Sequence, residues 1–111
     1  MKQPHTFLAT TLLVSISHSS TAMEFAGCYS EPGELINNGT YMFQSIGYCR
    51  DRCLAQEDIS HMALEGGNRC YCGTNAPPAR AIVESSNCSL PCVGYALETC
   101  GGDGFWQVYL I

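Results

Sequence analysis

Four cysteines stand in two close pairs, Cys49 with Cys53 and Cys70 with Cys72, and three kinds of chemistry use paired cysteines. The pairs could bind a metal ion, form a redox site or cross-link the chain. Structural zinc sites usually use C-x2-C pairs, and redox sites place such a pair beside a βαβ unit. Here the spacings are C-x3-C and C-x-C, and no βαβ pattern surrounds them. The spacing therefore favours disulfides, and no metal or cofactor is expected.

A helix lying on a β-hairpin would bring the two pairs together. Apolar residues and the first cysteine pair recur at helical spacing, which predicts a helix over residues 46–56 with Ser45 as its N-cap. The segments HMALE and RCYCG, residues 61–65 and 69–73, flank a glycine-rich turn and predict a hairpin. Positions four apart on a helix are separated by about 6 Å, and positions two apart on a strand by about 6.6–6.8 Å. The two pairs therefore have matched spacing.

This match predicts two adjacent disulfides between the helix and the hairpin. We expect Cys49–Cys70 and Cys53–Cys72, although the crossed pairing fits the spacing nearly as well.

The beginning of the chain has the pattern of a secretory signal peptide. One lysine, Lys2, precedes the apolar run FLATTLLVSI, and small residues follow it up to Ala22. The run is about half the roughly 20 residues that a membrane-spanning helix needs. We therefore expect a signal peptide over residues 1–22 and one exported domain over residues 23–111. No second hydrophobic segment follows, so we expect no membrane insertion of the mature chain and a secreted, extracellular or cell-wall associated product.

All eight cysteines lie in the expected exported domain, and an even number there implies four disulfides. Once the two disulfides between the helix and the hairpin are assigned, three pairings remain possible for the other four cysteines. Cys92–Cys100 would close a local loop, and Cys28–Cys88 would then tie the first strand to a late loop. A core this small is marginal alone, so the cross-links are expected to supply much of the stability.

The rest of the chain reads as short strands and loops. Residues 25–30 and 104–111 predict strands, and residues 31–40 and 74–87 predict loops. The expected fold is a small disulfide-rich α+β domain with one helix packed on a short antiparallel sheet.

Asn38 and Asn87 match the N-glycosylation pattern, and Asn87 is the weaker site because the adjacent Cys88 is expected in a disulfide.

Composition and residue inventory exclude several functions. Once Lys2 is removed, four arginines face ten acidic residues, so binding to nucleic acid or to an anionic membrane has no electrostatic basis. His61 is the only histidine of the expected mature domain, and all cysteines are committed to disulfides. Glu65 and Glu98 could pair as glycosidase acids only in a cleft that so short a chain can hardly form. We expect no catalytic residues.

The chain contains in order the motifs GCYS, CRDRC, RCYCG, CSLPCVGY and ETCGG and a closing VY. Together these motifs resemble the WSC domain, a cysteine-rich module of fungal cell-wall integrity sensors. All eight cysteines fall in the family's order. The resemblance implies a fold related to PAN/apple modules, a disulfide pattern that agrees with the one above, and a non-catalytic carbohydrate-binding function with β-glucan of the cell wall as the favoured ligand.

Sugars stack on exposed aromatic rings while polar groups bind their hydroxyls. Tyr71 should point away from its neighbouring cysteines and Tyr29 away from Cys28, because side chains alternate along a strand. The residues expected to bind carbohydrate are Tyr71, Tyr29, Tyr41 and Asn68, with hydrogen bonds also available from Asp103 and Gln107.

In so small a domain, Trp106, Phe25 and Phe43 are expected in the core. The protein is expected to be a monomer. The alternative function is a secreted effector or interaction module that binds another protein and no sugar.

Overall fold

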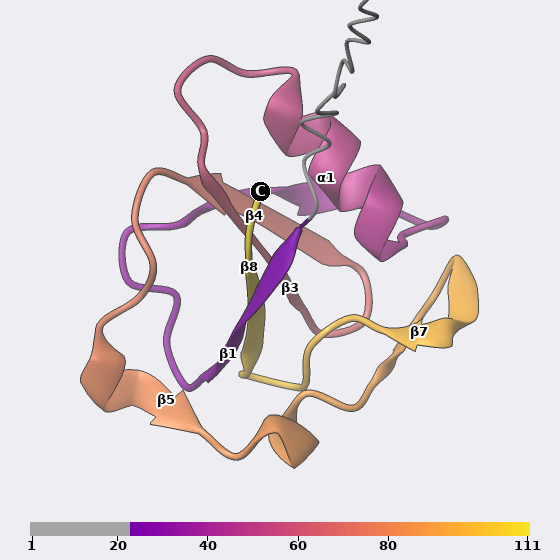
Figure 1. The fold of residues 1–111 in the computed structure, drawn as a ribbon. Helices are drawn as coiled ribbons and strands as arrows, with labels where there is room; N and C mark the ends of the chain where they lie inside the picture. The colour runs from indigo at the N-terminus through magenta and orange to yellow at the C-terminus, as the bar shows by residue number, and fades with distance from the viewer. Residues whose placement is uncertain (1–22) are drawn as a thin grey trace, which may run out of the picture.

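The computed structural model describes residues 23–111, and the expected signal peptide, residues 1–22, lies outside them. In the described part, one α-helix lies across a six-stranded antiparallel sheet, and a two-stranded sheet lies beside it (Figure 1). No helix in this part combines the length and apolarity needed to cross a bilayer. The elements are β1 Glu24–Tyr29, β2 Ile36–Thr40, α1 Ile46–Leu54, β3 His61–Glu65, β4 Arg69–Gly73, the 3-10 turn Ala79–Ala81, β5 Ile82–Val83, the 3-10 turn Ser85–Asn87, β6 Pro91–Cys92, β7 Tyr95–Thr99 and β8 Trp106–Leu110.

The sheet brings together strands from both ends of the described chain. Its order is β2-β4-β3-β8-β1-β5, and every neighbouring pair is antiparallel. The first strand, β1, pairs with the last, β8, from Glu24 opposite Leu110 to Tyr29 opposite Trp106. The expected hairpin forms from β3 and β4, with His61 opposite Gly73 and Glu65 opposite Arg69. The fold therefore has one helix on an antiparallel sheet, as expected, and its relation to PAN/apple modules stays a prediction.

Helix α1 begins where the sequence predicts and ends two residues earlier. The side chain of Ser45 accepts a hydrogen bond from the Tyr48 N–H at 3.0 Å, so Ser45 is the N-cap. The helix has nine residues, and its fully buried side chains are those of Cys49 and Cys53. A helix this short is unstable alone in water, so its attachment to the sheet depends on those two sulfurs.

Four disulfides connect the elements. Two adjacent rungs join α1 to β4 in the uncrossed arrangement, and both have Cα–Cα distances of 5.4 Å. A third ties β1 to the end of the Ser85–Asn87 turn, and the fourth closes the β6–β7 hairpin. No cysteine among the described residues is free. The pairs are Cys49–Cys70, Cys53–Cys72, Cys28–Cys88 and Cys92–Cys100.

Both faces of the sheet are covered, which the sequence does not predict. On the helix side, the disulfide sulfurs pack around Met62 and Leu64. On the opposite side, Tyr29, Leu35 and Val108 are buried in a second cluster with Ala63 and Ala81. Here the loop after β1 and the turn before β5 cover the sheet, and Tyr29 is only 5% exposed. The expectation that Tyr29 offers its ring to a ligand is therefore wrong.

Two expected loops contain short edge strands. Residues 31–40 end in β2, where Ile36 pairs with Cys72 and Asn37 with Tyr71. Asparagine and glycine are rare in strands, so the pairing with β4, and not local propensity, makes this segment extended. Residues 74–87 likewise include β5, where Val83 pairs with Cys28.

Candidate functional site

Two segments that are far apart in sequence carry exposed apolar side chains and contact each other through their backbones. One is the loop before α1, and the other is the turn of the β6–β7 hairpin, and Figure 1 shows them side by side. Phe43 is 75% exposed and Tyr95 is 48% exposed. We call this region the loop–hairpin surface, and its residues are Met42, Phe43, Val93 and Tyr95, with Leu97 further along β7 and Tyr48 in the first turn of α1.

Gly94 fixes the contact between the two segments. Its N–H donates a hydrogen bond to the carbonyl of Gln44 at 2.8 Å. A side chain at position 94 would overlap the backbone of Phe43, so only glycine allows this approach. The side chain of Gln44 is fully buried and donates to the carbonyl of Asn68 at 3.1 Å. These two hydrogen bonds therefore hold the backbone that carries Phe43 and Tyr95 in place.

The turn between β3 and β4 is the common anchor of both segments. The carbonyl of Gly67 accepts from the Val93 N–H at 3.1 Å, and that of Asn68 accepts from the Tyr41 N–H at 2.9 Å. Gly66 and Gly67 have φ of 70° and 86°, a left-handed conformation that favours glycine. Gly67 thus holds the hairpin, and Asn68 holds the loop.

An ion pair between the buried Glu65 and the partly exposed Arg69 braces this turn. Arg69 donates to both carboxylate oxygens of Glu65, at 2.6 and 3.2 Å, and the Gly104 N–H donates to the same carboxylate at 3.0 Å. Burial by itself would raise the pKa of the Glu65 carboxyl. The hydrogen bonds from Arg69 and Gly104 and the charge of Arg69 outweigh that effect, so the pKa lies below its usual value.

We expect this pair to make stability depend on pH. A depressed pKa stabilises the fold above the ordinary glutamate pKa of about 4.3, and that contribution is lost as the pH falls through the folded pKa. Glu65→Gln should reduce the free energy of unfolding by about 1.5–3 kcal/mol at pH 7 and flatten its decline between about pH 5 and pH 2. Urea unfolding across this range measures both. The exposed Glu84→Gln is the control, and an unchanged pH slope in Glu65→Gln contradicts the assignment.

The residues expected to bind carbohydrate do not lie together. Tyr71 points away from the helix side and packs edge-to-face on Trp106, with ring centroids 5.8 Å apart. Tyr41 packs on the helix-side cluster, where its ring meets Tyr48 at 5.0 Å and Arg52 at 5.3 Å. The backbone carbonyl of Asn68 accepts hydrogen bonds from the loop before α1. Tyr71 and Tyr41 are both half-buried, on opposite faces of the sheet.

Several other expectations change. Phe43 and Phe25 are exposed and not in the core, whereas Trp106 is half-buried and packed against the second cluster. Gln107 is buried, so it cannot meet a ligand on an open surface, while Asp103 is exposed. One signal for Phe43 was available. The buried positions of α1 are cysteines, so the apolar Met-Phe pair in the preceding loop is not part of a buried apolar face of the helix.

The accessibility of the two glycosylation candidates is the opposite of the expected order. Asn38 is half-buried and its side-chain oxygen accepts from Gln56 at 3.2 Å, whereas Asn87 is exposed despite its disulfide-bonded neighbour. Glycosylation at both stays a prediction.

Groups with possible chemistry are engaged in the structure. The sulfurs of Cys49, Cys53 and Cys70 lie within 4.8 Å of one another, but each belongs to a disulfide and is not a thiolate that could bind a metal. Glu98 accepts the Ile46 N–H at 3.0 Å at the start of α1. Burial lowers the pKa of His61, against a smaller raising effect of a backbone hydrogen bond at Thr74.

Comparison with known proteins identifies the family. The family model described as WSC domain matches residues 25–102, most of the described part. The chain belongs to the WSC domain family. The match ends before β8, although β8 lies between β3 and β1 in this WSC domain and completes its sheet.

Curated relatives carry the domain in longer proteins. Protein SLG1 of Saccharomyces cerevisiae is 35% identical over 98 residues, which cover 87% of this chain and 25% of that protein. Cell wall integrity and stress response component 1 of Schizosaccharomyces pombe is 38% identical over 85 residues, 76% of this chain and 22% of that protein. Xylosyltransferase oxt of Drosophila pseudoobscura pseudoobscura is 31% identical over 98 residues, 84% of this chain and 11% of that enzyme. The WSC domain described here therefore spans about a quarter or less of each of these relatives.

Proposed function

We propose that this WSC domain is a non-catalytic, exported module that binds cell-wall polysaccharide, with β-glucan as the ligand class. The observation that carries the proposal is the loop–hairpin surface, where the rings of Phe43 and Tyr95 are exposed on a braced backbone. The apolar face of a pyranose ring can stack on such a ring, and a rigid display lowers the entropy lost on binding.

Charge and relatives support the same ligand class. The chain is acidic, with a formal net charge of −5, which suits a neutral polymer better than a polyanion. The relative from Schizosaccharomyces pombe is named as a cell wall integrity and stress response component. Extracellular or wall-associated location and a monomeric state belong to this proposal, as does a lesser contribution from the half-exposed rings of Tyr71 and Tyr41.

Retention on insoluble β-1,3-glucan, chitin and mannan tests the proposal. Each aromatic stack contributes about 0.5–1.5 kcal/mol beyond its buried area. Combining Phe43→Ala with Tyr95→Ala should therefore weaken retention on β-glucan about tenfold. Ile82→Ala, which removes an exposed apolar side chain from β5, is the matched control and should bind as the parent does. Equal retention of the double variant and the parent contradicts the assignment of this surface.

The second candidate function is protein binding. Leu97 is 84% exposed and Met42 is also exposed, and aliphatic groups beside aromatic ones are typical of protein contacts. If the parent is retained on none of the three polysaccharides, this alternative replaces the first.

A further inference from the structure

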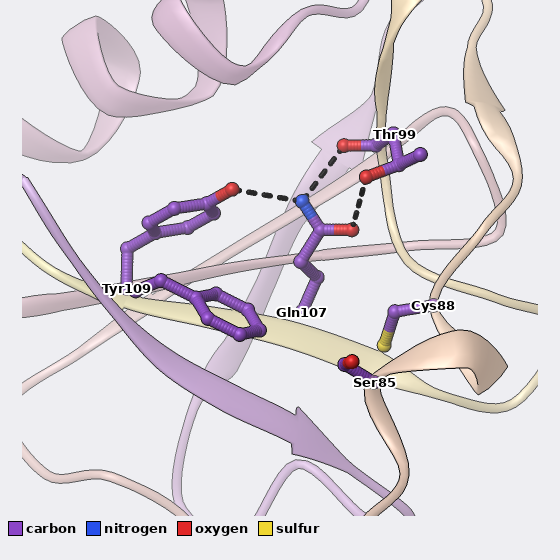
Figure 2. Close-up of a pocket in the computed structure, with 6 residues that line it drawn as sticks. Ser85, Cys88, Thr99, Gln107 and Tyr109 are labelled. Atoms are coloured by element: carbon purple, nitrogen blue, oxygen red, sulfur yellow. Dashed lines mark hydrogen bonds between the residues drawn. The ribbon is translucent and has the colours of Figure 1, made fainter.

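A pocket of about 310 Å³ is lined by none of the residues of the loop–hairpin surface (Figure 2). It is bounded by β1, β8, the end of β7 and the Ser85–Asn87 turn, and the disulfide of Cys28 and Cys88 closes one side. Its volume is at the small end of the range for ligand pockets, about 300–1,000 Å³. The lining residues are Phe25, Ser85, Cys88, Thr99, Gln107 and Tyr109.

One wall of the pocket is aromatic. The rings of Phe25 and Tyr109 meet edge-to-face with centroids 5.6 Å apart. Phe25 is 52% exposed and lies in the part of β1 that pairs with β8 and not with β5. The register of β1 against β8 shifts between Phe25 and Gly27, where Gly27 has φ of 138°. This bulge turns Phe25 toward the pocket mouth, as bulges commonly re-aim a side chain.

The side chain of Gln107 fixes which polar groups on the floor of the pocket donate hydrogen bonds and which accept them. Its side-chain oxygen accepts from the Gly101 N–H at 2.9 Å and from the Thr99 hydroxyl at 3.0 Å. A backbone N–H can only donate, so this contact fixes which end of the amide is the oxygen. Its nitrogen donates to the Thr99 carbonyl at 2.8 Å and to the Tyr109 hydroxyl at 2.9 Å. The amide of Gln107 is thus fully used within the protein.

Two ligand-binding groups follow from this network. Tyr109 accepts from Gln107, so its own proton remains available to donate. Thr99 donates its proton to Gln107, so its oxygen remains available to accept. Burial raises the pKa of Tyr109, opposed by the Gln107 hydrogen bond and assisted by the charge of Glu98, so the hydroxyl stays protonated. Ser85 adds a hydroxyl that can rotate to either role.

The lining also excludes charged ligands. None of the six lining residues carries a charge, so the pocket has no counter-ion for a phosphate, a carboxylate or an ammonium group. An aromatic wall, one fixed donor and one fixed acceptor suit the alternating apolar faces and hydroxyls of a neutral sugar.

We propose that this pocket binds a single neutral pyranose residue, a chain end or a branch of the polysaccharide. This inference rests on the proposed function and adds a second point of contact to it. The loop–hairpin surface would bind the polymer along its length, and the pocket would bind one residue by its edge.

Amide chemical shifts of the 15N-labelled protein test the pocket directly. Titration with methyl β-D-glucopyranoside should shift the amides of Phe25, Thr99 and Gly101 in a saturable way. Tyr109→Phe keeps the ring and removes the donor, so it should weaken binding about threefold to tenfold, the value of one hydrogen bond. Glucuronate should give no saturable shifts. Ile82→Ala, an exposed position that lines neither the pocket nor the loop–hairpin surface, is the control and should leave the glucoside titration unchanged.

The outcomes separate this inference from the proposed function. Saturable pocket shifts that weaken in Tyr109→Phe support the pocket, even if no insoluble polysaccharide retains the protein. Absent or non-saturable shifts overturn the pocket, even if β-glucan retains the protein through Phe43 and Tyr95. Equal affinity of the parent and Tyr109→Phe also overturns it, and near-identical spectra of the free proteins establish that the variant is folded.

Discussion

Replacing Cys28 and Cys88 together with alanine should lower the free energy of unfolding by about 4 kcal/mol, the largest loss among the four disulfides. These cysteines are 60 residues apart in sequence, against 21 and 19 for the two rungs and 8 for Cys92–Cys100. If the stabilisation comes from the entropy of the unfolded chain, it grows with that separation. The same relation gives about 3 kcal/mol for either rung and about 2.5 kcal/mol for Cys92–Cys100.

Thermal and urea unfolding of the four double-alanine variants measures this order. Removing both cysteines of a pair avoids a free thiol that could exchange with the remaining disulfides. A typical domain is stable by about 5–15 kcal/mol, so loss of the longest cross-link removes a large part of the total. If the Cys92–Cys100 variant proves the least stable, local geometry and not chain entropy governs the contribution of these bonds.

Gly94→Ala should weaken retention on β-glucan more than either Phe43→Ala or Tyr95→Ala alone. The added methyl group would overlap the backbone of Phe43 and break the hydrogen bond to Gln44, so the loop and the hairpin separate. Both rings then leave the common surface at once. We expect at least a tenfold loss of retention, equivalent to about 1.4 kcal/mol or more, with the disulfides intact by mass spectrometry.

Gly47→Ala is the matched control for this substitution. Position 47 lies in α1 and has open space where a methyl group would stand, so alanine should stabilise the helix by about 0.5–1 kcal/mol and leave retention unchanged. If Gly94→Ala binds β-glucan as Gly47→Ala does, the alignment of the two segments is irrelevant to binding.

The sequence predicts the helix and the hairpin because their signals are local. Ser45 caps α1 within one turn, and the spacing of the cysteines reflects the periods of a helix and a strand. Tyr71 likewise turns away from its neighbouring cysteines, as alternation requires. Such patterns need no knowledge of the rest of the chain.

Burial of the second sheet face could not be predicted in the same way. Alternation indicates which side of β1 carries Tyr29, but not that Leu35 and Ala81 cover that side. Exposure of Phe43 depends on Gly94, 51 positions later, whose contact has no periodic signature. The pocket likewise requires Phe25, Thr99 and Tyr109 to meet through a bulge and a disulfide. The candidate sites are thus products of tertiary contacts, whereas the framework is a product of local ones.

The pairing of β1 with β8 also determines how the domain responds to tension. Glu24 lies opposite Leu110, so a pull on the two ends of the described fold acts on neighbouring points of one ladder. Hydrogen bonds between antiparallel strands run perpendicular to the strands. A force applied at one end of the ladder therefore breaks these bonds one after another and does not load all of them at once. Peeling would reach Cys28 within a few residues, where the covalent link to Cys88 transfers the load to the rest of the molecule. The outer end of the ladder can thus yield under weak force while the remainder keeps its shape.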